Sequence, residues 1–199
     1  MTRDLNLAYE GDLDGCVLER IILAVGSPLQ VANKFDNHGN VRLKKNLRGY
    51  NNASKITPFI VLTDLDRTEC APTKINKWCT FERHRNFLFR IAVRSVEAWL
   101  LADREAMAGF LGLSKDKIKP DVEELEDPKR YLLNLAQKSR RKEVRDDLLP
   151  TPGRGAKIGP GYNSRLCRFA SSEWDPIRAS ENCDSLARAL RALERFRPE

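Results

Sequence analysis

The feature that most constrains the fold is a pair of mainly apolar runs in the middle of the chain. One covers residues 59–62, directly after Pro58, and the other extends from Phe87 to Val93 and leads into a helical pattern. Runs of this length without a helical period are typical of strands covered on both faces. They predict a sheet whose central strands are buried between layers of helices.

The flanking segments extend this pattern. Residues 5–9 and 29–35 alternate apolar and polar side chains, which predicts two strands, and a helical pattern begins between them at Asp12. We interpret residues 36–57 as a long polar loop containing at most one short helix, because glycines and paired asparagines interrupt it. Further helices are expected over residues 96–111 and 183–196.

This order of elements predicts an α/β fold with a mainly parallel sheet flanked by helices. A length of 199 residues favours one domain with a small appendage. We expect residues 1–113 to form the core and residues 114–199 to form a basic loop and a helical extension packed on that core.

Two side chains in the expected 96–111 helix are assigned structural roles. Trp99 lies on the apolar stripe of this helix and is expected in the hydrophobic core. Asp103 falls on the same stripe, where a carboxylate must be paired or hydrogen-bonded. We therefore expect Asp103 to bind an arginine or a backbone amide.

The cysteines and the apolar runs also limit the class of protein. The five cysteines form no Cys-x-x-Cys pair, and only His38 and His84 could complete a zinc site. We therefore expect five reduced thiols and no structural zinc. Every apolar run is far shorter than the roughly 20 residues that a bilayer span needs, and no apolar signal segment begins the chain. These features predict a cytoplasmic protein that does not contact membranes.

Positive charge is concentrated in one part of the chain. The formal net charge is +7, and residues 127–168 alone contain eleven lysines and arginines but four acids. Such a segment favours a polyanionic partner, because cations gain free energy by releasing the counterions of phosphates. On charge alone, a solvated helix face explains it equally well. The candidate nucleic-acid contacts are Arg140, Arg141, Lys142, Arg154, Lys157 and Arg165.

Acidic residues follow the expected strands. Glu10 ends the first strand, Asp64 and Asp66 follow the central run, and Glu97 comes just after the last strand. In an open parallel sheet these ends share one edge, and Asp14 lies one helical turn beyond Glu10. Each acid alone is explained equally well as a turn former or a favourable start of a helix. Together they predict a site for Mg²⁺, which prefers carboxylate oxygens.

The motifs Leu7-Ala-Tyr-Glu10-Gly11 and Leu62-Thr-Asp64-Leu-Asp66 resemble the Toprim domain of topoisomerases, bacterial primases and the overcoming-lysogenization-defect (OLD) nucleases. Asp14 is similar to the second acid of the nuclease branch. The segment from Val96 to Asp103 resembles small prokaryotic Toprim-like proteins that are often encoded beside ABC- or SMC-type ATPases. The resemblance covers residues 5–113.

This resemblance implies a Toprim-like, Rossmann-like fold and a metal-dependent nuclease. It implies Mg²⁺ or Mn²⁺ bound by Glu10, Asp14, Asp64, Asp66 and Glu97, with Glu10 as ligand or general base. Lys157 would assist the reaction, by its position downstream of the acids. The implied partners are a nucleic acid, DNA in preference to RNA, and an ABC- or SMC-type ATPase in an antiphage system.

Two other functions stay open at this point. The first is a non-catalytic Toprim-like subunit that binds nucleic acid or an ATPase, because a fold does not determine a function. The second is nucleotidyl transfer of the primase kind. The oligomeric state, monomer or homo-oligomer, is open as well.

Overall fold

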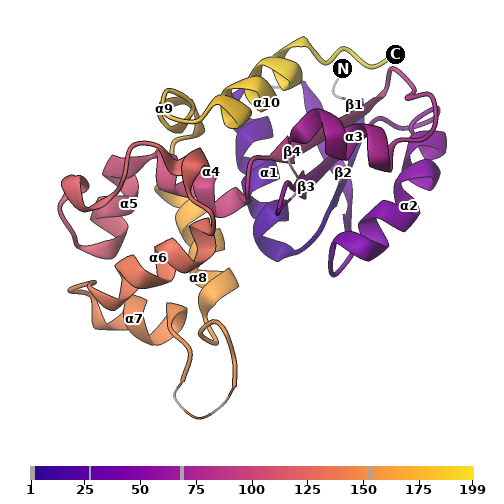
Figure 1. Ribbon diagram of the computed structural model, residues 1–199. Helices are drawn as coiled ribbons and strands as arrows, with labels where there is room; N and C mark the ends of the chain where they lie inside the picture. Colours follow the sequence, from indigo (N-terminus) through magenta and orange to yellow (C-terminus); the bar gives the residue numbers. More distant parts are fainter. Residues whose placement is uncertain (1–2, 27, 68–69, 152, 154) are drawn as a thin grey trace.

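The computed structural model describes residues 3–26, 28–67, 70–151, 153 and 155–199, and a parallel sheet lies at its centre (Figure 1). Within this described part, four strands pair in the order β2-β1-β3-β4, and each neighbouring pair is parallel. The prediction of an α/β fold with a mainly parallel sheet flanked by helices is therefore confirmed. The strands are β1 (Arg3–Tyr9), β2 (Leu29–Asp36), β3 (Phe59–Asp64) and β4 (Phe87–Ala92).

Alternate side chains of β3 enter two different apolar clusters, as expected for a strand covered on both faces. Phe59 and Val61 pack with the helices α2 (Asn40–Ala53) and α3 (Ala71–Trp78). Ile60 and Leu62 pack on the opposite face. The continuous run in the sequence thus reflects two layers of helices on one strand.

Helix α2 corrects our interpretation of residues 36–57 as a polar loop. It is a helix of 14 residues whose buried side chains include Leu43 and Leu47, four residues apart on one face. Gly39 precedes it with φ +118°, a left-handed value that favours glycine, and Gly49 lies on its exposed surface. Tyr50 stacks on Phe59 of β3. The buried Asn51 donates to the Glu82 carbonyl and accepts from the His84 N–H, so a helix of polar and basic mean composition is still held on the sheet.

The opposite face of the sheet is covered by α1 (Asp12–Ala24), α4 (Val96–Ala102) and α10 (Asp184–Arg195). Trp99 of α4 is fully buried there, as predicted, and its indole N–H donates to the Ser185 hydroxyl at 2.7 Å. The same apolar cluster contains side chains from Leu5 to Phe196. The boundary at residue 113 stays a prediction.

The single helix expected over residues 96–111 is divided into α4 and α5 (Arg104–Leu111). Asp103 separates them, because its carboxylate accepts from the Ala106 N–H at 3.2 Å and caps the start of α5. The same carboxylate accepts two hydrogen bonds from the Arg178 guanidinium, both at 2.7 Å, and one from the Asp175 N–H at 2.9 Å. The prediction that Asp103 binds an arginine or a backbone amide is confirmed.

The remaining elements are η1 (Lys115–Lys117), η2 (Val122–Glu124), α6 (Pro128–Gln137), α7 (Lys142–Leu148), α8 (Tyr162–Ser172) and α9 (Pro176–Ser180). Figure 1 shows α5, α6 and α7 on the side of α4 away from the sheet. Helix α8 packs on α1 and also contacts α7, and α9 contacts both α4 and α1. No helix in the described ranges is both long enough and apolar enough to cross a membrane.

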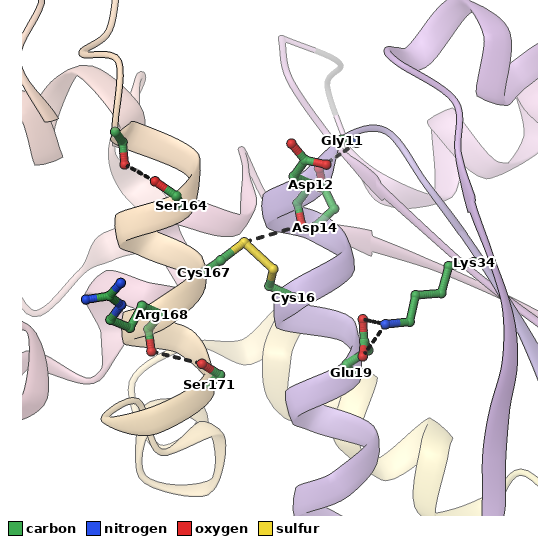
Figure 2. The surroundings of a disulfide bond; sticks show 11 residues. Gly11, Asp12, Asp14, Cys16, Glu19, Lys34, Ser164, Cys167, Arg168 and Ser171 are labelled. Atoms are coloured by element: carbon green, nitrogen blue, oxygen red, sulfur yellow. Dashed lines mark hydrogen bonds and ion pairs between the residues drawn. A yellow bond between two sulfur atoms is a disulfide. The ribbon is translucent and has the colours of Figure 1, made fainter. Parts of the chain in front are cut away.

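A disulfide corrects the prediction of five reduced thiols. Cys16 of α1 and Cys167 of α8 are bonded, with their Cα atoms 5.4 Å apart, although 151 positions separate them in the sequence. Figure 2 shows the bond between the two helices, which lie side by side. Cysteine spacing could not indicate this pair, because only the packing of α8 on α1 brings it together. The cysteines outside this bond are Cys70, Cys79 and Cys183.

Candidate metal centre

The candidate acids are carried by elements that meet at the carboxyl edge of the sheet. Glu10 directly follows β1, and Asp64 is the last residue of β3. Asp14 lies in the first turn of α1, and Glu97 is the second residue of α4, which follows β4. Because the strands are parallel, their carboxyl ends share this edge.

Asp14 has an unsatisfied oxygen in a buried position. Its side chain is buried, and Oδ2 accepts a hydrogen bond from the Gly11 N–H at 3.1 Å at the start of α1. Oδ1 is also buried and has no hydrogen-bond partner within the described structure. A buried carboxylate oxygen without a partner is costly unless a cation or a water binds it.

The carboxyl groups lie close enough to repel one another. Burial raises the pKa of Asp14 well above its usual value, and the charges of Glu10 and Glu97 raise it further. Burial also raises the pKa of Asp64 well above its usual value, with further contributions from Asp14, Glu97 and Glu10. The pKa of Glu10 is raised by its burial. Four carboxyl groups from four elements thus share one electrostatic environment.

Hydrogen bonds fix one oxygen of each of the other three acids. Glu10 Oε1 accepts from the Thr63 hydroxyl and from the Asp64 N–H, the latter at 3.1 Å. Asp64 Oδ1 accepts from the Val96 N–H at 3.0 Å, at the start of α4. Glu97 Oε1 accepts from the hydroxyl of Tyr162 at 2.9 Å. These bonds orient the carboxylates and leave the second oxygen of each for another ligand.

Asp66 lies at the rim of this group and not inside it. Its side chain is 50% exposed, and its Oδ2 is 3.3 Å from the amide nitrogen of Asn40 and 3.4 Å from Lys74 Nζ. Asp66 and Arg94 both have left-handed backbones, with φ of +56° and +60°. The Asp66 N–H donates to the Arg94 carbonyl at 3.0 Å, which joins the loops that follow β3 and β4. Backbone strain of this kind costs about 1–3 kcal/mol per residue and is concentrated at functional sites.

Two lysines near the acids were not among the predicted site residues. Lys74 of α3 is 2% exposed, and its ammonium donates to the Asp64 carbonyl. Lys129 of α6 lies 3.9 Å from Glu97 Oε1. A sequence signal exists for Lys74, which lies on the same helical stripe as Ala71, Ile75 and Trp78. Lys129 has no such signal, because only the packing of α6 on α4 places it there.

A cleft of about 730 Å³ opens beside two of the four acids, Asp64 and Glu97. The loops after β3 and β4 line it together with the segment that begins α6. The wall thus combines carboxylates with cations, the groups needed for a metal ion and for a phosphate. Its charged residues are Asp64, Asp66, Glu97, Glu126, Asp127, Arg67, Arg94, Lys129 and Arg130.

The predicted basic residues do not line this cleft. Arg140, Arg141 and Lys142 are exposed at the start of α7, and Lys157 is exposed in the loop between α7 and α8 that projects from the molecule (Figure 1). Arg165 is bound to Asp147 at 2.6 Å and ties α8 to α7. Arg154 lies outside the described residues.

The donor set fits a hard divalent cation. Over the described ranges, no three side chains of His, Cys, Asp or Glu are arranged to coordinate one metal ion together. Mg²⁺ does not require this, since it usually binds one or two carboxylates and completes its shell with waters and substrate phosphates. The unsatisfied Asp14 Oδ1 and the mutual repulsion of the acids are the features that a cation would relieve.

No known protein-family profile matches the chain, and no curated protein matches it. Among solved structures, the chain is similar to the "C-terminal region of the Burkholderia pseudomallei OLD protein". The two are 14% identical with a TM-score of 0.43, over 94% of this chain and 98% of that chain. Similarity at this level does not assign the chain to a family.

Proposed function

We propose that the protein is a Mg²⁺- or Mn²⁺-dependent nuclease that hydrolyses phosphodiester bonds. The observation that supports this most is the group of four carboxylates, Glu10, Asp14, Asp64 and Glu97, which repel one another around the unsatisfied oxygen of Asp14. The resemblance of the motifs around Glu10 and Asp64 to Toprim domains supports the same function.

In this proposal, Asp14, Asp64 and Glu97 would hold the metal, Asp66 at the rim would complete the set, and Glu10 would serve as a further ligand or as the general base. A bound divalent ion would neutralise phosphate charge and make water a better nucleophile. Glu10, whose pKa burial raises, would accept the proton of the attacking water. Water would then form the new P–O bond as the bond to the leaving oxygen breaks.

The cations around the cleft would bind the phosphates. Lys129 and Arg130 of α6 and Arg94 would offset the charge that develops at phosphorus. Buried Lys74 would position the loop of Asp64 and Asp66 through its contacts with both residues. The role of Lys157 rests on its sequence position alone, because it is exposed outside the cleft.

The exposed cations of residues 127–168 would bind the nucleic-acid backbone without base specificity. DNA as the preferred substrate, an ABC- or SMC-type ATPase partner, an antiphage role, a cytoplasmic location and a homo-oligomer are further parts of this proposal. They come from the sequence analysis, and each needs its own test.

The proposal is tested by incubating the protein with labelled DNA or RNA and Mg²⁺ or Mn²⁺, without and with nucleoside triphosphates. We expect cleavage by the parent and its loss in Asp64→Asn/Asp66→Asn. The matched control is Asp12→Asn, which removes an exposed carboxylate from the first turn of α1 and should still cleave.

Cleavage that survives in Asp64→Asn/Asp66→Asn would exclude this pair from the reaction. Template-directed extension would support nucleotidyl transfer instead. A parent protein that binds nucleic acid but shows neither cleavage nor stabilisation by metal would be a non-catalytic subunit.

A further inference from the structure

A second basic surface lies on the other side of the sheet from the segment 127–168. Residues 37–63 contain no Asp or Glu, although they include five lysines and arginines. Four of these cations are on α2 and the fifth follows it. They are Arg42, Lys44, Lys45, Arg48 and Lys55.

These five cations are exposed and uncompensated. Each is exposed, and none forms an ion pair with another described residue. Arg48 lies 5.4 Å from the ring centre of Phe81, and Lys44 lies 6.0 Å from that of Trp78. The charged groups of these two side chains therefore lie over aromatic rings at the exposed surface.

The positive charge continues from α2 to the loop before β4. A hollow of about 590 Å³ at the carboxyl end of α2 is lined by Arg48, Lys55, Phe81 and Arg83, among others. Arg83 is exposed in the loop before β4, so the cations of α2 continue onto this loop.

We propose that this α2 surface, formed by Arg42, Lys44, Lys45, Arg48, Lys55 and Arg83, binds the phosphate backbone of a nucleic acid. Helix α2 is roughly 20 Å long, enough for several phosphates. Its first residue, Asn40, contacts Asp66 at 3.3 Å, so the surface begins at the rim of the metal centre. A strand bound along α2 would thus lead to the acidic cleft.

A nucleic acid fits this surface better than a membrane does. A helix that lies in a bilayer interface inserts its apolar side into the lipid. The apolar side of α2, with Leu43 and Leu47, is instead buried on the sheet. The side that faces solvent carries the cations, which suits a phosphate backbone.

The α2 surface is separate from the basic start of α7. In Figure 1, α2 and α7 lie at opposite sides of the molecule. The inference shares its ligand class, a nucleic acid, with the proposed function. It does not depend on the metal chemistry, so binding can be measured in EDTA.

The test uses the full chain with Arg42→Gln, Lys45→Gln and Arg48→Gln combined, because glutamine keeps helix propensity and removes charge. Binding to a fluorescent DNA duplex is measured in EDTA over a range of salt concentrations. The matched control combines Lys115→Gln, Lys117→Gln and Lys119→Gln, which removes the same charge from exposed residues around η1. Thermal melting verifies that both variants fold.

We expect the α2 variant to bind at least about tenfold more weakly at low salt. The slope of log affinity against log salt should fall by about 0.9 for each lost phosphate contact. The control should stay within about twofold of the parent. Equal weakening in both variants, or no weakening in either, would overturn the proposal.

A membrane is tested with vesicles that contain phosphatidylserine. Loss of vesicle binding in the α2 variant, with duplex binding unchanged, would also overturn the proposal. Failure of the α2 proposal can be distinguished from failure of the nuclease proposal. A parent that never cleaves DNA can still lose duplex binding in the α2 variant, and a parent that cleaves can still bind normally when α2 is altered.

Discussion

At the scale of single residues, Asp14 is a buried carboxylate, and within the described structure only one of its two oxygens has a hydrogen-bond partner. In Asp14→Asn the repulsion by Glu10 and Glu97 is removed, while the acceptor for the Gly11 N–H is kept. We expect the free energy of unfolding in metal-free buffer to rise by about 1 kcal/mol, or roughly 2–4 °C in melting temperature. The melting-temperature increase that Mg²⁺ or Mn²⁺ gives the parent should disappear.

Calorimetry or thermal melting with and without metal measures both effects, and Asp12→Asn serves as the exposed control. A metal-induced increase of parental size in Asp14→Asn would remove this residue from the proposed ligands.

A second residue-scale prediction concerns the buried charge of Asp103. Its side chain is fully buried, and Arg178 is its ionic partner. In Arg178→Met, the carboxylate keeps its backbone donors but loses the opposite charge. We expect a loss of about 3 kcal/mol in the free energy of unfolding, because a buried charge is left uncompensated. Urea unfolding measures it, and Asp103→Asn/Arg178→Met should recover part of the loss; a single variant as stable as the parent would contradict the argument.

At the scale of elements, the disulfide joins the helix that carries Asp14 to the helix that carries Tyr162. Cys16 and Cys167 close a segment of 151 positions, so their bond restricts the unfolded chain strongly. We expect Cys16→Ser/Cys167→Ser, or a dithiol reductant, to lower the free energy of unfolding by about 2–4 kcal/mol. Cys70→Ser alters an exposed cysteine outside the Cys16–Cys167 bond and is the control. Free-thiol titration of the denatured parent should find three thiols; five would show that the bond does not form.

At the scale of the whole molecule, a cut in the loop between α7 and α8 should leave two fragments that the disulfide still joins. Lys157 is exposed in this loop, so brief trypsin treatment should cut the chain between α7 and α8, after Lys157 or Arg154, and yield two fragments. The Cys16–Cys167 bond joins these fragments. We expect one band of full size on a denaturing gel without reductant and two bands with it. Early cleavage inside α1 or α8 instead would show that these helices are not the stable contact described above.

Much of the sheet could be predicted from the sequence, because the runs and alternations at residues 5–9, 29–35, 59–62 and 87–93 depend on local burial. The same periodicity placed Glu10, Asp64 and Glu97 after successive strands, although their binding of a metal stays a prediction. Sequence periodicity failed at α2, where a few apolar side chains and the hydrogen bonds of Asn51 hold a largely polar helix on the sheet. Sequence periodicity also missed the break between α4 and α5 at Asp103. There the Asp103 carboxylate caps the start of α5, and the two helices do not continue as one.

The sequence by itself determined the fold class and the basic segment, because each depends on residues close together in the chain. It also placed acids at the ends of three strands, and the parallel sheet brought those ends to one edge. Only the tertiary structure decided which distant groups meet. The packing of α8 on α1 pairs Cys16 with Cys167, α6 places Lys129 beside Glu97, and α3 buries Lys74 against Asp64. Such contacts join segments that are 10 to 151 positions apart, and local sequence patterns do not predict them.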